Sequence, residues 1–112
     1  VLVNLLNNAA QAMGEKPDGK IEVRTRADDN NVYIDVSDNG KGMSTEVLNQ
    51  IFEPFFTTKG AGEGTGLGMA ISQQIMEQHN GDIKAVSTEG VGTTFTLTLP
   101  INNDLTEKSL AA

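Results

Sequence analysis

The sequence predicts a two-layer α/β sandwich, in which helices cover one face of a sheet. Two observations support this prediction. Apolar side chains in residues 1–14 recur at the spacing of a helix, and four later segments alternate apolar with polar residues. Clean alternation is typical of strands in a sheet with one wet face, so the helices are expected to cover the other face.

Three helices are expected. In residues 1–14 an apolar stripe lies opposite a stripe of amides, and a segment with glycine and proline ends the helix. Residues 44–52 form a short helix with Ser44 as its N-cap. A third helix over residues 67–79 ends at an Asn-Gly pair, and residues 53–66 form a loop. The apolar stripe of the first helix consists of Leu2, Leu5, Leu6, Ala9, Ala12 and Met13.

Four strands are expected, over residues 20–27, 31–37, 82–88 and 93–99. Turns at residues 28–30 and 89–92 would join them into two hairpins. In the last strand Phe95, Leu97 and Leu99 would face the helices, while the threonines between them would face solvent.

Composition limits the function classes. The chain has 112 residues, the size of one domain, and a net charge of −7, which disfavours nucleic acid and anionic membranes as partners. It has no cysteine and one histidine, which excludes disulfides, thiolate chemistry and histidine-rich metal sites. No apolar run reaches the roughly 18 residues of a membrane span. We expect a cytoplasmic domain over residues 1–101 and a polar tail over residues 102–112.

Asp38 is a candidate ligand-binding carboxylate. It continues the inward parity of the strand before it, so it points toward the helical layer from the strand's end. A carboxylate in that position needs hydrogen-bond donors, and the glycines at 40 and 42 leave room for a ligand beside it. An exocyclic amine such as adenine N6 would supply a donor. The alternative is an ordinary Asp-Asn-Gly turn.

The amide stripe of the first helix is a second candidate. Asn4 and Asn8 are one turn apart, with Gln11 on the same stripe. Solvated helix faces usually carry Lys and Glu, so uncharged amides indicate a polar cavity, and an amide oxygen suits Mg²⁺. The alternative is a plain solvated face.

A glycine-rich stretch over residues 64–70 leads directly into a helix start. Free N–H groups and the positive end of the helix dipole attract phosphate there, and Lys59 could add a positive charge. The alternative is a glycine-rich linker. Upstream, Phe55 and Phe56 suit either the anchors of a closing lid or ordinary packing. His79 is interpreted as a helix-terminal residue that complements the dipole.

Taken in order, five motifs resemble those of the catalytic, ATP-binding domain of bacterial sensor histidine kinases. They match the Asn box, the first glycine box, the Phe box, the second glycine box and the closing Gly-Thr strand. The resemblance covers residues 1 to about 100 and implies a Bergerat-type fold, a mixed, largely antiparallel sheet with helices on one face. The motifs are residues 4–9 (NLLNNA), 38–43 (DNGKGM), 51–59 (IFEPFFTTK), 64–68 (GTGLG) and 92–95 (GTTF).

The resemblance implies ATP and Mg²⁺ as cofactors and assigns roles to the matching residues. Asn8 would ligate Mg²⁺ and Asn4 would assist at the phosphates, so these two are the candidate catalytic residues. Asp38 would take the adenine amine, with Gly42 close by and Thr93 acting through water. Further nucleotide contacts would come from Gln11, Gly40, Met43, Phe52, Phe56, Thr57, Lys59, Gly64, Thr65, Gly66, Leu67 and Gly68.

Two positions depart from patterns seen among relatives, while residues 53–64 resemble a short lid over the nucleotide. The related ATPases carry a Glu one turn before the Mg²⁺ ligand, as the base for water. Asn4 cannot accept a proton, so hydrolysis should be poor, whereas an imidazole acceptor is already a nucleophile. Many relatives have Lys or Arg where Gln11 stands, so Mg²⁺ and Lys59 must balance the phosphate charge.

The resemblance also implies partners. The phosphoacceptor histidine would lie in a dimerisation bundle of the same parent protein, a homodimer that can be anchored in the inner membrane, with a response regulator downstream. The chain opens in mid-helix, and the family has a strand and a helix before this point. We therefore expect a truncated fragment with an exposed sheet edge and apolar surface. Two alternatives remain, an ATP-binding module without transfer and a serine kinase of the anti-sigma type.

Overall fold

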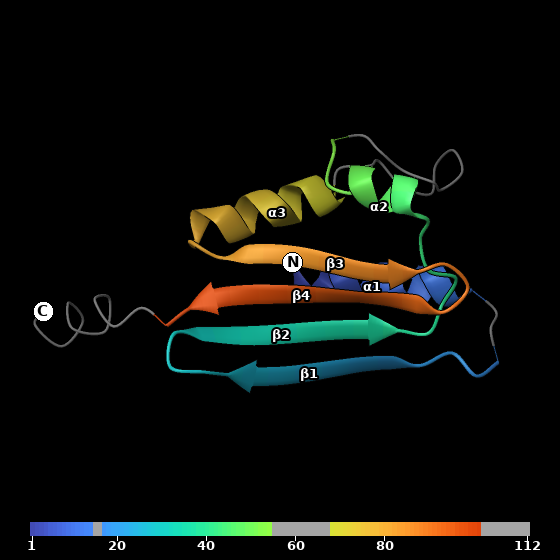
Figure 1. The fold of residues 1–112 in the computed structure, drawn as a ribbon, viewed down its shortest axis with the longest axis horizontal. Coiled ribbons are helices and arrows are strands. Elements are labelled where there is room, and N and C mark those ends of the chain that lie inside the picture. The colour runs from blue at the N-terminus through green and yellow to red at the C-terminus, as the bar shows by residue number, and fades with distance from the viewer. Residues whose placement is uncertain (15–16, 55–67, 102–112) are drawn as a thin grey trace, which may run out of the picture.

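The computed structural model describes residues 1–14, 17–54 and 68–101. Within these ranges helices and strands follow one another in the predicted order (Figure 1). The predicted bounds differ from the observed ones by no more than two residues at each end. In chain order the elements are α1 (Leu2–Met13), β1 (Ile21–Ala27), β2 (Asn31–Asp38), α2 (Thr45–Gln50), α3 (Gly68–Gln78), β3 (Asp82–Thr88) and β4 (Gly92–Pro100).

The strands form one open sheet in the order β1-β2-β4-β3. Every pairing among the described strands is antiparallel, so the mixed part of the expected sheet is not seen there. α1 packs on β1 and β2, α3 packs on β3, and the two helices touch each other, so they form a second layer (Figure 1). The predicted two-layer sandwich is confirmed.

The core lies between the two layers. Its buried members come from both helices and from three strands: Leu5, Val36, Met69, Met76, Ile83, Phe95 and Leu97. The alternation predicted for β4 is confirmed for Phe95 and Leu97, which are buried, while Leu99 is only partly buried. None of the described helices has the length and apolar character needed to cross a membrane.

The apolar stripe of α1 is only partly buried, which corrects the prediction. Leu5 and Ala9 are buried, whereas Leu2 and Leu6 expose 40% and 38% of their surface, because no described element covers that flank of the helix. Val23 of β1 is 52% exposed, and β1 pairs on one side only. The expected open edge and exposed apolar surface are therefore present.

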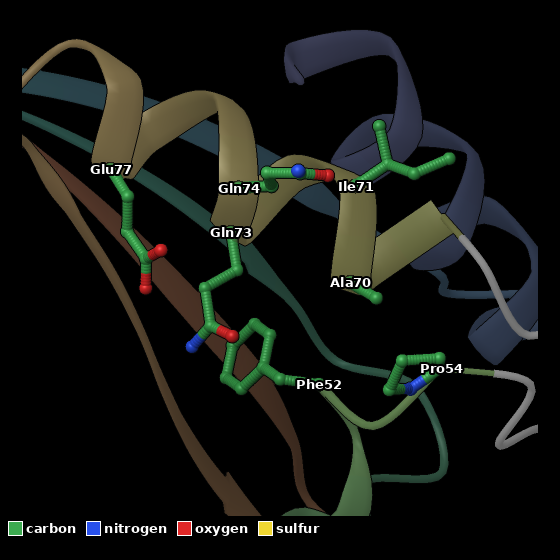
Figure 2. A pocket seen from close by; sticks show the side chains of 7 residues that line it. All are labelled: Phe52, Pro54, Ala70, Ile71, Gln73, Gln74 and Glu77. Atoms are coloured by element: carbon green, nitrogen blue, oxygen red, sulfur yellow. The ribbon is translucent and has the colours of Figure 1, made fainter.

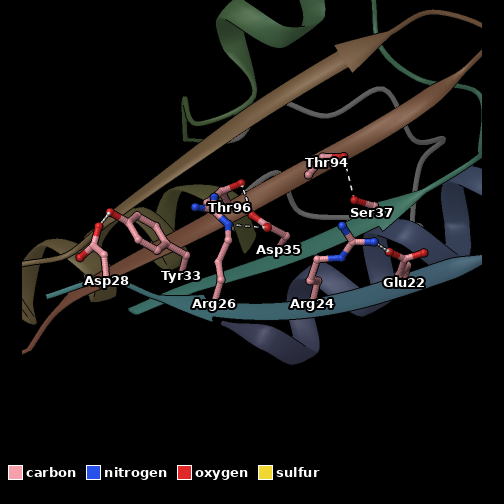
Figure 3. Close-up of polar contacts among 9 residues, drawn as sticks. All are labelled: Glu22, Arg24, Arg26, Asp28, Tyr33, Asp35, Ser37, Thr94 and Thr96. Atoms are coloured by element: carbon pink, nitrogen blue, oxygen red, sulfur yellow. Dashed lines mark hydrogen bonds and ion pairs between the residues drawn. The ribbon is translucent and has the colours of Figure 1, made fainter. Parts of the chain in front are cut away.

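The other face of the sheet carries a polar network (Figure 3). Asp35 accepts hydrogen bonds from Thr96 Oγ1 at 2.7 Å and from Arg26 Nε at 3.1 Å. The Arg26 guanidinium lies 4.3 Å from the centre of the Tyr33 ring, a cation–π contact. The Tyr33 hydroxyl in turn donates to Asp28 Oδ2 at 2.8 Å. These contacts tie β1, β2 and β4 together on the wet face.

Two carboxyl groups of this network have lowered pKa values. The hydrogen bond from Thr96, followed by that from Arg26, lowers the pKa of Asp35. The backbone N–H of Asn30, followed by the Tyr33 hydroxyl, lowers the pKa of Asp28. Both carboxylates therefore favour the folded state in their ionised form.

Asp35→Asn should lower the free energy of unfolding by about 1 kcal/mol at neutral pH, because a neutral amide replaces a charged acceptor. The loss should be constant above the ordinary pKa of the group. It should vanish as the pH falls through the lowered native pKa, since the native state binds that proton less readily than the unfolded state. Urea titrations at several pH values measure this difference.

Asp82→Asn is the control for this experiment, because the Asp82 carboxylate has only Lys84 nearby, at 3.9 Å on the exposed surface. An equal loss in both variants, or a loss that grows toward acid pH, would contradict the role given to Asp35.

The open edge of β1 predicts self-association of the 112-residue chain. Antiparallel pairing of two copies centred on Val23 would place Glu22 of each copy opposite Arg24 of the other and would bury both valines. Sedimentation velocity should show a dimer whose fraction rises with protein concentration. Val23→Lys should abolish it, whereas Val91→Lys, in an exposed turn, should not. A monomer at every concentration would count against this prediction.

Candidate functional site

A row of side chains crosses the sheet where β2 ends. Its members are successive register partners on the four strands: Ile21, Asp38, Thr93 and Ser87. Val36, two residues before Asp38 on the same face, is buried in the core, so the inward parity predicted for Asp38 is confirmed. This row is the centre of the candidate site.

Asp38 uses one carboxylate oxygen within the protein. Its Oδ1 accepts the backbone N–H of Gly40 at 2.9 Å, which is the turn contact of the alternative interpretation. Among the described residues no donor is recorded for Oδ2, and the side chain is only half-buried. The two interpretations are therefore compatible, because one oxygen closes the turn and the other is open to a ligand.

Thr93 is buried beside this carboxylate, with 6% of its surface exposed. Its Oγ1 lies 2.7 Å from Ser87 Oγ, which also accepts the backbone N–H of Met43 at 2.7 Å. Ser87 was not among the predicted site residues. The register of the predicted second hairpin could have found it, since that hairpin already brings Ser87 beside Thr93.

The segment after β2 is held by close backbone contacts. A Cβ on Gly40 would lie 2.7 Å from the carbonyl of Ala12, whose oxygen also accepts the N–H of Lys41 at 3.1 Å. A Cβ on Gly42, which has a φ of 68°, would lie 2.1 Å from Thr88 O. Glycine is thus required at both positions by the packing of the protein on itself. From the sequence, these glycines were expected to leave room for a ligand or to belong to an Asp-Asn-Gly turn, and their packing against α1 and β3 was not predicted.

Asn4 connects α1 to the start of α3. Its Nδ2 donates to Ser72 Oγ at 3.2 Å and to Gly68 O at 3.5 Å. A plain solvated face is therefore wrong for Asn4. Crowding does not require glycine at position 68, because a Cβ there would meet no atom nearer than Asn4 Cγ at 3.9 Å. Among the described residues, position 68 therefore makes only ordinary contact, with the Asn4 side chain.

One stripe of α1 links the two ends of the site. Asn4, Asn8 and Ala12 follow one another at intervals of four residues, so they lie on the same side of the helix. The stripe therefore spans about 12 Å, from the start of α3 to the backbone of Gly40. Half-buried Asn8 lies between these ends, and Gln11 is exposed.

Phe52 lies beside α3 rather than at the row. With Pro54 it lines a hollow of about 310 Å³ against the outer side of α3, where its ring faces Gln73 (Figure 2). Phe52 and Met43 also pack against the core, whereas Phe55 and Phe56, for which a lid or ordinary packing was expected, lie outside the described residues. Several predicted contacts and most of the predicted lid fall outside the described residues: Phe56, Thr57, Lys59, Gly64, Thr65, Gly66 and Leu67.

The donor set limits which metal could be bound. The described residues contain no cluster of His, Asp or Glu side chains that could hold an ion by itself. A cation there would have to be coordinated by an amide oxygen together with oxygens of a ligand. Mg²⁺ is commonly coordinated in this way, by few protein ligands and by phosphate oxygens. The half-buried amide of Asn8 fits such a role.

Comparisons with known proteins agree with this geometry. A sequence model described as histidine kinase-, DNA gyrase B-, and HSP90-like ATPase matches residues 1–103. The chain is 50% identical over 102 residues to the sensor histidine kinase ZraS of Escherichia coli strain K12. It is 48% identical over 103 residues to the signal transduction histidine-protein kinase AtoS of the same strain. Both alignments cover 91% of this chain but only 21% and 16% of the relatives' lengths.

A solved structure, the catalytic domain of histidine kinase ThkA, has a similar fold. Its TM-score is 0.75 at 36% sequence identity, and the alignment covers 88% of this chain and 63% of that chain. The similarity supports the resemblance found in the five sequence motifs.

Asn4→Ala should lower the free energy of unfolding by about 1–2 kcal/mol, because it removes the hydrogen bonds that join α1 to α3 and leaves the buried Ser72 hydroxyl without one partner. Asn7→Ala is the matched control on the exposed side of the same helix and should change stability by less than about 0.5 kcal/mol. Chemical denaturation measures both values. Equal losses in the two variants would show that the hydrogen bonds between α1 and α3 do not contribute to the free energy of unfolding.

Proposed function

Since the chain belongs to the family of histidine kinase-, DNA gyrase B-, and HSP90-like ATPases, we propose that it binds ATP with Mg²⁺ and donates the γ-phosphoryl group to a histidine. The acceptor lies on a separate dimerisation and phosphoacceptor domain of the same sensor kinase. One observation carries the proposal: the half-buried Asp38 carboxylate, whose Oδ2 has no recorded donor among the described residues, is the register partner of the buried Thr93.

The row at the end of β2 suits the adenine base. Asp38 Oδ2 is an acceptor, and the exocyclic N6 of adenine is a donor, whereas guanine presents a carbonyl oxygen at that edge. A carboxylate would repel that oxygen, so the site selects adenine by rejecting the alternative as well as by binding the amine. Thr93, through its hydroxyl, supports the same edge of the base.

The other end of the α1 stripe suits the phosphates. A helix start offers backbone N–H groups to an anion, and α3 begins at Gly68, where a Cβ would come no nearer than 3.9 Å to Asn4 Cγ among the described residues. The Asn8 amide oxygen would hold Mg²⁺ together with phosphate oxygens. When bound, Mg²⁺ neutralises phosphate charge, which the described residues around this end do little to balance. Lys59 and the glycines at 64 and 66 complete our proposed phosphate contacts.

Asn4 favours transfer over hydrolysis. Attack by water needs a base, and an amide cannot take a proton. Here the Asn4 nitrogen is also engaged with α3. An imidazole nitrogen can attack the γ-phosphorus unaided: it forms the new N–P bond, the bond to the bridging oxygen of ADP breaks, and the ring proton is lost. The domain's task is then to position the reactants and balance charge.

The proposal includes the setting in which the domain acts. The relatives ZraS and AtoS are histidine kinases. By analogy, the parent protein is a homodimer with the ATP-binding domain in the cytoplasm, and a tether to the inner membrane belongs to another segment of that protein. A response regulator then receives the phosphoryl group.

Asp38→Asn should weaken ADP binding about 10- to 150-fold, the range for loss of a hydrogen bond to a charged acceptor. Calorimetric titration with ADP and Mg²⁺ measures the change. Asp82→Asn, which alters an exposed carboxylate on β3, is the control and should bind normally. Unchanged affinity in Asp38→Asn would refute the adenine assignment.

Transfer is tested with the full-length protein and γ-labelled ATP. The label should appear on protein as an acid-labile, alkali-stable phosphoramidate, and the Asp38→Asn variant should lose it. An acid-stable phosphoester would instead favour a serine kinase. Nucleotide binding without any label on protein would favour an ATP-binding module.

A further inference from the structure

Ser87 is the member of the row with the largest number of recorded polar contacts among the described residues. Its Oγ lies 2.7 Å from Met43 N, 2.7 Å from Thr93 Oγ1 and 3.1 Å from Gly92 O. It is half-buried on β3, two strands away from Asp38. No sequence motif drew attention to it.

Counting protons restricts how these contacts can be made. A serine hydroxyl has one proton and two lone pairs. The Met43 N–H can only donate, and the Gly92 carbonyl can only accept. All three contacts are satisfied together in one arrangement alone, in which Ser87 donates to Gly92 O and accepts from both Met43 N and the Thr93 hydroxyl. The Thr93 proton is then used on Ser87.

This arrangement fixes what Thr93 offers to the rest of the site. With its proton held by Ser87, Thr93 Oγ1 has only lone pairs left for the rest of the site, where Asp38 is its register partner on β2. The end of the row is then lined by two acceptors. A group that enters there must bring donors, as an amine or a bridging water does, and a carbonyl oxygen meets lone pairs on both sides.

We propose that Ser87 is a specificity-determining positioning residue, which holds the Thr93 hydroxyl as an acceptor and so strengthens the selection of 6-amino over 6-oxo purines. The inference rests on the proposed binding of adenine at Asp38. Ser87 acts through Thr93 and through the Met43 backbone and does not itself touch the base.

The test compares ADP with IDP, whose purines differ at position 6, where an amine is replaced by a carbonyl, and at the adjacent N1, where a lone pair is replaced by an N–H. In Ser87→Ala the Thr93 proton is released and can meet a carbonyl or turn to Asp38. ADP affinity should fall about fivefold, the effect of one neutral hydrogen bond, while IDP affinity should fall less or rise. The ADP-to-IDP affinity ratio should therefore drop several-fold, whereas a purely structural defect would weaken both ligands alike.

Two variants serve as controls. Ser87→Thr keeps the hydroxyl and should restore the ratio. Ser37→Ala breaks a matched pair on the wet face, where Ser37 Oγ lies 2.8 Å from Thr94 Oγ1 (Figure 3), and should leave both affinities unchanged. A thermal melt of each variant shows whether it is folded at the temperature of the titration.

A double-mutant cycle keeps the proposal testable if the Ser87→Ala substitution lowers the stability of the protein. Thr93→Val removes the hydroxyl on which Ser87 acts, so adding Ser87→Ala to it should change the ADP-to-IDP ratio no further. Additive effects, or an unchanged ratio in Ser87→Ala, would overturn the role of Ser87. Wild-type protein that binds ADP and IDP equally, or binds neither, would instead refute the proposed adenine site.

Discussion

The close packing of the segment after β2 is the constraint on which the site depends. Gly40 lies against the last turn of α1, and Gly42 lies against the end of β3. The segment is therefore wedged between the helical layer and a hairpin of the sheet, with the N–H of Lys41 bonded to one side and its carbonyl bonded to Gly90 N on the other. Asp38 directly precedes this wedge, so the direction of its carboxylate is set by the contact between the two layers.

Charge explains why the described part of the site is built from neutral amides and hydroxyls. The chain carries a net charge of −7, and its nucleotide would add further negative charge. A single carboxylate at the base end gives discrimination where the ligand is neutral. Amide side chains on α1 and the backbone of α3 avoid adding repulsion at the other end. In the proposed site, attraction there would come from Mg²⁺, from Lys59 and from the local backbone dipoles.

Local patterns were sufficient for much of the fold and for part of the site. Period-two alternation gave the inward direction of Asp38, and the hairpin turn gave the pairing of β3 with β4. The direction of Asn4 could not be predicted in this way, because it depends on where α3 packs, 64 residues later in the sequence. The same limit applies to Leu2 and Leu6, which have core-like spacing but lie on a flank that no described element covers.

The glycines show a second limit of local reasoning. From the sequence, the glycines at 40 and 42 were expected to leave room for a ligand or to close a turn, and contact with the protein's own backbone was not expected. At positions 40 and 42 a Cβ would clash with the protein's own backbone, whereas at position 68 it would make ordinary contact with the Asn4 side chain, at 3.9 Å. Only the distance from a hypothetical Cβ to its neighbours separates the two cases.

The cation–π contact between Arg26 and Tyr33 on the wet face determines what can be learned from the protein's own fluorescence. Tyr33 is the sole tyrosine, there is no tryptophan, and the ring is held by Arg26 and by the bond to Asp28. It lies five positions before Asp38 on β2, about 17 Å away along the strand and on the opposite face. The fluorescence of Tyr33 should therefore change when the sheet unfolds but not when a nucleotide binds at Asp38. Unfolding and ligand binding can then be followed as separate signals in one sample.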